Sequence, residues 1–382
     1  MIKRLSCAPV LQRLNSLRQR LAGSVPLVQR HVALLLASLV LAVAQPSGAQ
    51  TSAVKPITVV ATPNPNVFPL LLALERQPQL AVKLLAVADG AEMDQAFAKQ
   101  GADAVLAMTS TIASKVVSGA VPPLRLTDVT MWKGITAMVM GDIPARTLAD
   151  LKGQGFILSG ATTGGRDGGP DLLFRAALAR SGLKPDDLKT CYLPVMTGVD
   201  WLMQRKPLGD HANCEPDKDM PAAGMFLVEP AISGLAMMSR MPFKPKVDAR
   251  IAIEPVFSGF KAWPASQLPH GGLALRIATL DDKAREAAVR QLRVAYAAAI
   301  DEINATRGST VARWNLSSTI SKSFKQHFGA LGLELPALAL ASALGENRLV
   351  FRNDLSVNSV RDDLARLLNE VVGRTIPGSF YQ

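Results

Sequence analysis

A glycine-rich stretch that leads directly into a helix constrains this chain more than any other segment. Five glycines fall within ten residues, at positions 160, 164, 165, 168 and 169. Glycine allows positive φ and close approach of a ligand, and the free N–H groups of a helix start attract an anion. Pro170 suits the first helical position, and an apolar stripe follows at Leu172, Ala176, Ala179 and Leu183. The stretch predicts a ligand-binding turn between a strand and a helix, the alternative being an ordinary connection. Its spacing matches neither the nucleotide P-loop nor the dinucleotide fingerprint.

The positive charge of the chain is concentrated at its N-terminus. The formal net charge is +11 over 382 residues, and the first 49 residues hold six basic side chains and no acid, so removing these six leaves +5. The remainder carries no basic run interleaved with aromatic residues. We therefore expect no nucleic-acid partner.

An apolar run follows the basic segment over residues 31–44 and precedes small residues. This order is typical of a secretory signal peptide, and the run is too short to span a bilayer comfortably. We expect a signal peptide over residues 1–49, with cleavage after Ala49 preferred to cleavage after Ala44. An uncleaved anchor, or a start codon assigned too early, remains the alternative. The mature protein is expected to be exported.

Cysteine use agrees with an exported protein. Cys7 would leave with the signal peptide, and Cys191 and Cys214 would remain as an even pair in an oxidising compartment. We expect either a disulfide between them or two separate buried thiols. His211 lies near Cys214 in a Pro-rich, charged segment that is more typical of an exposed loop than of a zinc site. No metal site and no cofactor are predicted.

Apolar strand patterns alternate with helical patterns along most of the chain, which predicts an α/β fold with largely parallel sheets and helices on their faces. Strands are expected at residues 57–61, 82–87, 102–107, 124–129, 135–140, 156–159, 190–193, 225–228, 251–253 and 273–277. Helices are expected at residues 66–74, 92–99, from 109, 148–152, from 170, 197–203, 231–238 and 280–306, and further helices are expected to centre on 321–328, 336–344 and 360–372. Ligands of such sheets bind beyond the carboxyl ends of the strands.

Four motifs, in this order, resemble the solute-binding proteins of nitrate, sulfonate, taurine and bicarbonate ABC importers. They are Thr147–Gly153, Gly169–Arg175, Ser181–Leu188 and Leu227–Ala231, and the resemblance runs from about Ile57 to the C-terminus. It implies a type II periplasmic-binding fold with two lobes, each a mostly parallel sheet flanked by helices, and a ligand in the cleft between them. The expected division is residues 55–133 for lobe one, 134–254 for lobe two, and 255–382 for the return to lobe one with C-terminal helices.

The resemblance also implies a function and partners. It indicates a monomeric periplasmic protein that captures a small anionic solute by hinge closure and delivers it to an ABC permease with its ATPase. Enzymes on the same fold, similar to thiamine-pyrimidine synthases or menaquinone-pathway proteins, are the alternative. No Ser-His-Asp or Cys-His set can be placed in the cleft, so we expect no enzyme. A binder that feeds a sensor is a third possibility that the sequence does not separate from transport.

The ligand contacts implied by the resemblance come from turns after strands. They are Asn64, Phe68, Thr109, Ser110, Thr111, Trp132, Thr162, Thr163, Gly164, Gly165, Met196, Thr197 and Glu229. The turn at 165–168 is longer than the pattern expects, and residues 205–221 look like an insertion.

Several of these contacts also have a structural interpretation. Glu229 can cap a helix, Phe68 and Trp132 can pack in the core, and the hydroxyls at 109–111 can form an N-cap. Arg166 can neutralise an anion or be solvated.

Overall fold

The computed structural model describes residues 55–159, 168–210, 214, 220–242, 244–247 and 249–382. These residues belong to one compact unit, Val54–Gln382. The predicted signal peptide over residues 1–49 lies outside the described residues. Within the described part, no helix combines the length and the apolar character that crossing a bilayer requires.

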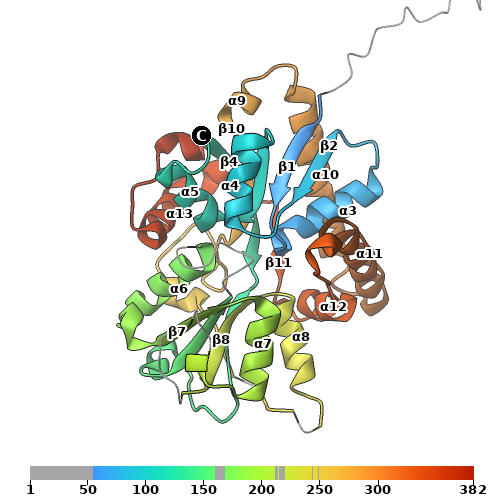
Figure 1. Ribbon diagram of the computed structural model, residues 1–382. Helices are drawn as coiled ribbons and strands as arrows, with labels where there is room; N and C mark the ends of the chain where they lie inside the picture. Colours follow the sequence, from blue (N-terminus) through green and yellow to red (C-terminus); the bar gives the residue numbers. More distant parts are fainter. Residues whose placement is uncertain (1–54, 160–167, 211–213, 215–219, 243, 248) are drawn as a thin grey trace, which may run out of the picture. The chain divides into compact units, whose positions relative to one another are not determined.

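The first sheet has six strands in the order β11-β4-β10-β3-β1-β2 (Figure 1). Strand β1 pairs in parallel with β2 and β3, whereas β10 runs antiparallel to β3 and β4, and β11 antiparallel to β4. The strands are β1 Ile57–Ala61, β2 Val82–Ala86, β3 Ala104–Met108, β4 Leu124–Lys133, β10 Gly271–Arg276 and β11 Val350–Phe351.

The second sheet has five strands in the order β7-β6-β8-β5-β9. Strand β6 pairs in parallel with β7 and β8, and β5 runs antiparallel to β8 and β9. The strands are β5 Ile135–Val139, β6 Gly155–Ser159, β7 Lys189–Leu193, β8 Ala222–Val228 and β9 Ala249–Ile251.

The expectation of mostly parallel sheets is wrong, because both sheets are mixed. Strand–helix–strand repeats build only part of each sheet, namely β1 to β3 and β6 to β8, and these are the parallel parts. The chain passes from one sheet to the other between β4 and β5 and returns between β9 and β10. The returning strand β10 lies between β3 and β4 and runs opposite to both. The α/β class itself is confirmed.

Helices cover both faces of the first sheet (Figure 1). The alternation of side chains along strands sends Val59 and Leu106 to a core shared with α3 and α10, and Val60 and Val105 to a core shared with α4 and α5. The helices are α3 Phe68–Arg76, α4 Gly90–Lys99, α5 Thr109–Ser118, α6 Gly169–Arg180, α7 Val195–Gln204, α8 Ala231–Met238, α9 Ile277–Leu280, α10 Glu286–Ala305, α11 Thr310–Phe328, α12 Ala337–Gly345 and α13 Val357–Val372. Short 3₁₀ helices occupy Pro65–Val67, Leu148–Leu151, Pro185–Asp187, Leu208–Asp210, Glu254–Phe257, Gly329–Leu331 and Gly378–Tyr381.

Local signals explain where several helices begin and end. The Asp89 carboxylate accepts from the backbone N–H groups of Ala91 and Glu92 and caps α4. Ser356 caps α13 in the same way. Gly119 and Gly373 follow α5 and α13 in the left-handed conformation, which glycine adopts without steric cost.

Cys191 and Cys214 are joined by a disulfide. It ties β7 to the segment that precedes β8. After α7, the backbone N–H of Leu208 donates to the Met220 carbonyl over 3.0 Å, and Pro207 and Pro221 form an isolated antiparallel bridge just before β8. The segment predicted as an insertion therefore begins and ends at neighbouring positions.

Candidate ligand-binding site

A cavity of about 540 Å³ lies among residues that follow strands of both sheets. Asn64 and Phe68 come after β1, Met196 lies in α7 after β7, and Glu229 follows β8. The structure thus brings four of the predicted contact residues to one cavity. The other lining residues are Pro63, Pro65, Val195, Val199, Val228, Pro230, Ala231, Gly234, Leu235, Met238, Phe324, Gly332, Leu333, Glu334, Leu335, Pro336 and Ala339.

Asn64 shapes the turn after β1. Its side-chain amide donates to the Thr62 carbonyl over 3.0 Å and to Thr62 Oγ1 over 2.9 Å. Its Oδ1 accepts from the Asn66 backbone N–H and from Asn66 Nδ2, over 2.9 and 2.8 Å. Both ends of the amide are engaged within the turn, so Asn64 acts as a cap beneath the cavity wall.

Tyr296 of α10 holds the same turn from the other side. Its hydroxyl donates to the Asn66 carbonyl over 2.7 Å and lies 3.2 Å from Thr130 Oγ1. Burial raises the pKa of Tyr296 above its ordinary value, because a charged phenolate would be desolvated there. The hydroxyl therefore stays protonated and keeps its role as a donor.

Phe68 and Phe324 form an aromatic part of the wall. Phe68 is 2% exposed, and its ring meets that of Phe324 edge to face, with centroids 6.3 Å apart. Phe324 stacks in turn on Phe328, one turn further along α11. Sequence reasoning did not identify Phe324; the aromatic pair at i and i+4 was its one local signal, and this pattern does not say which cavity a helix faces.

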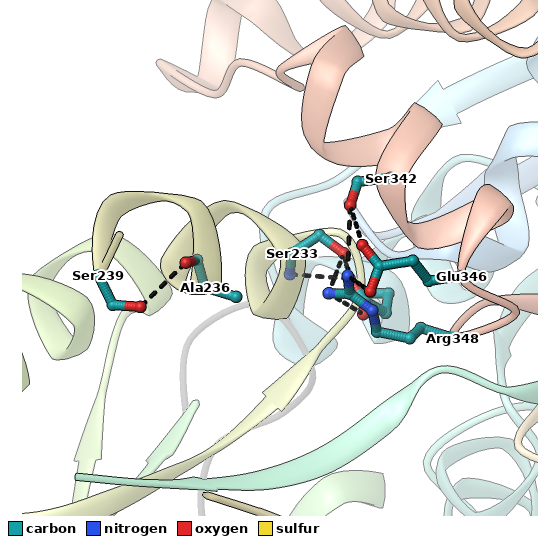
Figure 2. Close-up of polar contacts among 7 residues, drawn as sticks. Ser233, Ala236, Ser239, Ser342, Glu346 and Arg348 are labelled. Atoms are coloured by element: carbon teal, nitrogen blue, oxygen red, sulfur yellow. Dashed lines mark hydrogen bonds and ion pairs between the residues drawn. The ribbon is translucent and has the colours of Figure 1, made fainter. Parts of the chain in front are cut away.

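Glu229 is buried, and its charge is compensated by a polar network whose members Ser233, Ser342, Glu346 and Arg348 are labelled in Figure 2. Its Oε2 accepts from the backbone N–H and hydroxyl of Ser233 over 3.0 and 2.7 Å, and its Oε1 lies 3.8 Å from Arg348 Nη1. Arg348 Nη1 also donates to the Ser233 hydroxyl over 2.9 Å. The Arg348 guanidinium also donates to the hydroxyl of Ser342 in α12, and it pairs with the carboxylate of Glu346, the residue just after α12. Because Arg348 precedes β11, this network joins the second-sheet helix α8 to the first-sheet side. Sequence reasoning missed Arg348, which lies far from Glu229 in the chain.

The hydroxyl cluster at Thr109–Thr111 lies against the start of α6. Ser110 Oγ donates to the Gly169 carbonyl over 3.3 Å, and the Gly169 N–H donates to Thr111 Oγ1 over 3.1 Å. Thr109 Oγ1 donates to the Pro269 carbonyl over 2.5 Å. Two voids of about 10 Å³ lie beside these residues, each the size of one water molecule. Ser110 and Thr111 thus connect the first turns of α5 and α6, and ligand contact by the cluster stays a prediction.

The remaining predicted contacts lie away from the cavity lining or outside the described residues. Trp132 is fully buried in β4, packs near Trp263 with centroids 5.7 Å apart, and donates its indole N–H to the Val129 carbonyl. Thr197 lies in α7 but is not among the lining residues. Thr162, Thr163, Gly164 and Gly165 lie outside the described residues.

The charged side chains among the described lining residues are Glu229 and Glu334, and these lining residues include no Lys, Arg or His. Glu334 forms an exposed ion pair with Lys325. Across the described part of the chain, no group of three or more His, Cys, Asp or Glu side chains is arranged to hold a metal ion.

No family model matches this chain, and no curated protein matches it. Several solved structures align with this chain along most of its length. The periplasmic aliphatic sulphonate binding protein SsuA from Escherichia coli aligns with a TM-score of 0.56 at 15% identity, over 84% of this chain and 86% of that one. The alkanesulfonate-binding protein SsuA from Xanthomonas axonopodis pv. citri, bound to MOPS, aligns with a TM-score of 0.53 at 16% identity, over 85% and 95%. A Candida albicans protein described as exhibiting the generic periplasmic binding protein fold aligns with a TM-score of 0.51 at 11% identity, over 85% and 93%.

The chain has the periplasmic-binding-protein fold. The fold implied by the four sequence motifs is therefore confirmed. At these identities the likeness concerns the fold, and function must be argued from the site.

Proposed function

We propose that this protein is the solute-binding component of an ABC importer. The observation that carries the proposal is the cavity of about 540 Å³, whose walls come from turns and helices after strands of both sheets. Its volume lies in the range typical of small-molecule sites. The structural neighbours include binding proteins for aliphatic sulphonates and components of ABC import systems, which supports this role. The partners in the proposal are a small solute and a permease with its ATPase.

Hinge closure is the working step of the proposal. A solute that contacts Phe68 on one side and Leu235 on the other favours the arrangement in which both are close, because only that arrangement offers both sets of contacts. The contacts of Ser110 and Thr111 with Gly169, and of Arg348 with Ser233, would form and break with such a motion.

Three finer parts of the proposal rest on sequence. Export depends on the predicted signal peptide over residues 1–49. The anionic solute depends on the glycine-rich turn at Thr162–Gly165 and on the helix start that follows it. The monomeric state rests on the family resemblance.

The experiment is recovery of the natural solute. Protein purified without denaturation from its own host should release about one equivalent of one small molecule when it is denatured, as detected by mass spectrometry. Disrupting the gene should abolish uptake of that molecule, and the purified protein should return it chemically unchanged after prolonged incubation. Normal uptake in the disrupted strain would refute the transport role, and conversion of the molecule would favour an enzyme.

A further inference from the structure

The chemistry of the cavity wall points to a class of solute other than the anion that the glycine-rich turn predicts. This inference rests on the proposed solute-binding role and replaces the anionic part of it. We infer that the cavity takes an uncharged, predominantly apolar organic molecule, with an aromatic ring or a branched or extended hydrocarbon as its body. Small inorganic anions and short zwitterions would not match it.

The first argument is the nature of the walls. Phe68, Phe324 and Leu335 face the cavity from the first-sheet side, and each is 6% exposed or less. Val199 and Leu235 line it from α7 and α8 and are equally buried. These buried side chains form an apolar floor, and the apolar surface still open to water belongs to the exposed Met196 and to half-buried neighbours in the lining. The half-buried neighbours are Val195, Val228, Met238 and Leu333. An apolar solute that covers this surface removes it from water, which favours binding.

The second argument is that the polar side chains of the described wall already have partners. Asn64 uses its amide within the turn at Thr62 and Asn66. Glu229 is compensated by Arg348 and accepts twice from Ser233. A charged solute would lose its hydration without gaining a cationic partner from the described lining, and unpaired charges are costly to bury.

The third argument is size and access. A volume of about 540 Å³ suits an organic molecule of several to many heavy atoms rather than a single small ion. Met196, 63% exposed, lies at the rim and offers a flexible apolar side chain to an entering solute. Gly234 of α8 keeps space open opposite Ala339, since a Cβ built on it would lie 3.8 Å from the Ala339 Cβ.

Two fluorescent probes with the same ring system test the charge and the location. N-phenyl-1-naphthylamine is uncharged, and 8-anilinonaphthalene-1-sulfonate adds one sulfonate to it. We expect the uncharged probe to bind the full-length protein at one saturable site at least about tenfold more tightly than the sulfonate, a difference of about 1.4 kcal/mol. Equal or tighter binding of the sulfonate, or no saturable binding of the uncharged probe, would overturn the inference.

Variants locate the site. Gly234→Leu should fill the space opposite Ala339 and weaken binding of the uncharged probe at least about tenfold. Leu335→Ala removes part of the wall without adding bulk, and it should weaken binding of the uncharged probe several-fold. This second variant keeps the test decisive if Gly234→Leu fails to fold. Leu338→Ala is the matched control, because Leu338 is apolar and 52% exposed on α12 but does not line the cavity. Unchanged affinity in both cavity variants would overturn the inference.

The outcome separates this inference from the proposed function. Recovery of one equivalent of a small inorganic anion from the native protein, with uptake lost in the disrupted strain, would uphold transport and overturn the apolar solute. Tight cavity binding of the uncharged probe, with uptake of the recovered solute unchanged in the disrupted strain, would uphold the apolar cavity and refute the transport role.

Discussion

At Gly169, the absence of a side chain decides how closely two helices approach. A Cβ built there would lie 2.2 Å from Thr111 Oγ1 and 2.9 Å from Ser110 Oγ, which is too close for any residue but glycine. We predict that Gly169→Ala lowers the free energy of unfolding by about 1–3 kcal/mol through overpacking, measured by urea unfolding. Gly308→Ala is the control, because a Cβ added at Gly308 would meet nothing within 4 Å, and it should change stability by less than about 0.5 kcal/mol. Equal effects of the two substitutions would contradict the close approach.

Asp363 of α13 links the C-terminal helix to the segment that returns to the first sheet. It accepts from the backbone N–H groups of Lys261 and Ala262 over 2.6 and 2.8 Å and pairs with Arg366. Burial alone would raise the pKa of Asp363, but the Arg366 pair and the two N–H groups outweigh it and hold the pKa below its ordinary value of 3.8.

The sign of the pH dependence follows from that lowered pKa. The stabilisation is fully present above the unfolded-state pKa and is lost as pH falls through the lower folded-state value. We predict that Asp363→Asn lowers the free energy of unfolding at pH 7, and that the gap to wild type narrows progressively below about pH 4. Urea unfolding of both proteins at pH 7, 5 and 3 measures this difference in free energy of unfolding. A gap that stays constant over this range would show that the ionised carboxylate is not the stabilising form.

At the scale of elements, the disulfide between Cys191 and Cys214 restrains the connection from β7 to β8. The two cysteines are 23 residues apart, and closing a loop of that length stabilises the folded state by about 3 kcal/mol through chain entropy. We predict that Cys214→Ser lowers the free energy of unfolding by about that amount. A reducing agent should destabilise the wild type similarly and leave the variant unaffected. Labelling of both thiols by a maleimide in unfolded, unreduced protein would rule the disulfide out.

Most strands begin and end within two or three residues of where the sequence predicts them. The helix α11 departs further from its prediction. It spans Thr310–Phe328, whereas the apolar pattern centred it on 321–328. Val311 and Trp314 are exposed apolar residues in its first turns, at 70% and 47%. Exposed apolar side chains blur the contrast between the two faces of a helix, so its periodicity becomes visible only further along. Strand β11 was also missed, because two residues carry no period.

At the scale of the whole described unit, the pair of Glu229 and Arg348 couples the second-sheet helix α8 to the first-sheet side. Removing Arg348 would leave a buried carboxylate without its cation, which costs about 3–5 kcal/mol in comparable buried pairs. We predict such a loss for Arg348→Met and a smaller loss for the double variant Glu229→Gln with Arg348→Met than the two single losses combined. Urea unfolding of the four proteins measures the coupling. Losses that add to within about 0.5 kcal/mol would show that the two side chains act independently.

The candidate site was predictable where it depends on strand ends. Asn64, Phe68, Met196 and Glu229 were identified by their places after strands, and the structure brings them to one cavity. The wall formed by Phe324, Leu335 and Ala339 was missed, because α11, α12 and the connection between them come from the C-terminal section and follow no strand directly.

Local order in this protein follows from the amino-acid pattern. The period of apolar residues, the capping side chains and the glycines at helix ends act within a few residues of one another, so they can be interpreted without knowing the fold. Three other features do not follow from any local pattern. They are the position of β10 between β3 and β4, the contact of Gly169 with the start of α5, and the pairing of Arg348 with Glu229. Each joins residues far apart in the chain, whose meeting depends on how whole elements pack, and no local pattern records it. The mixed sheets and the apolar, internally compensated cavity were therefore decided by tertiary packing.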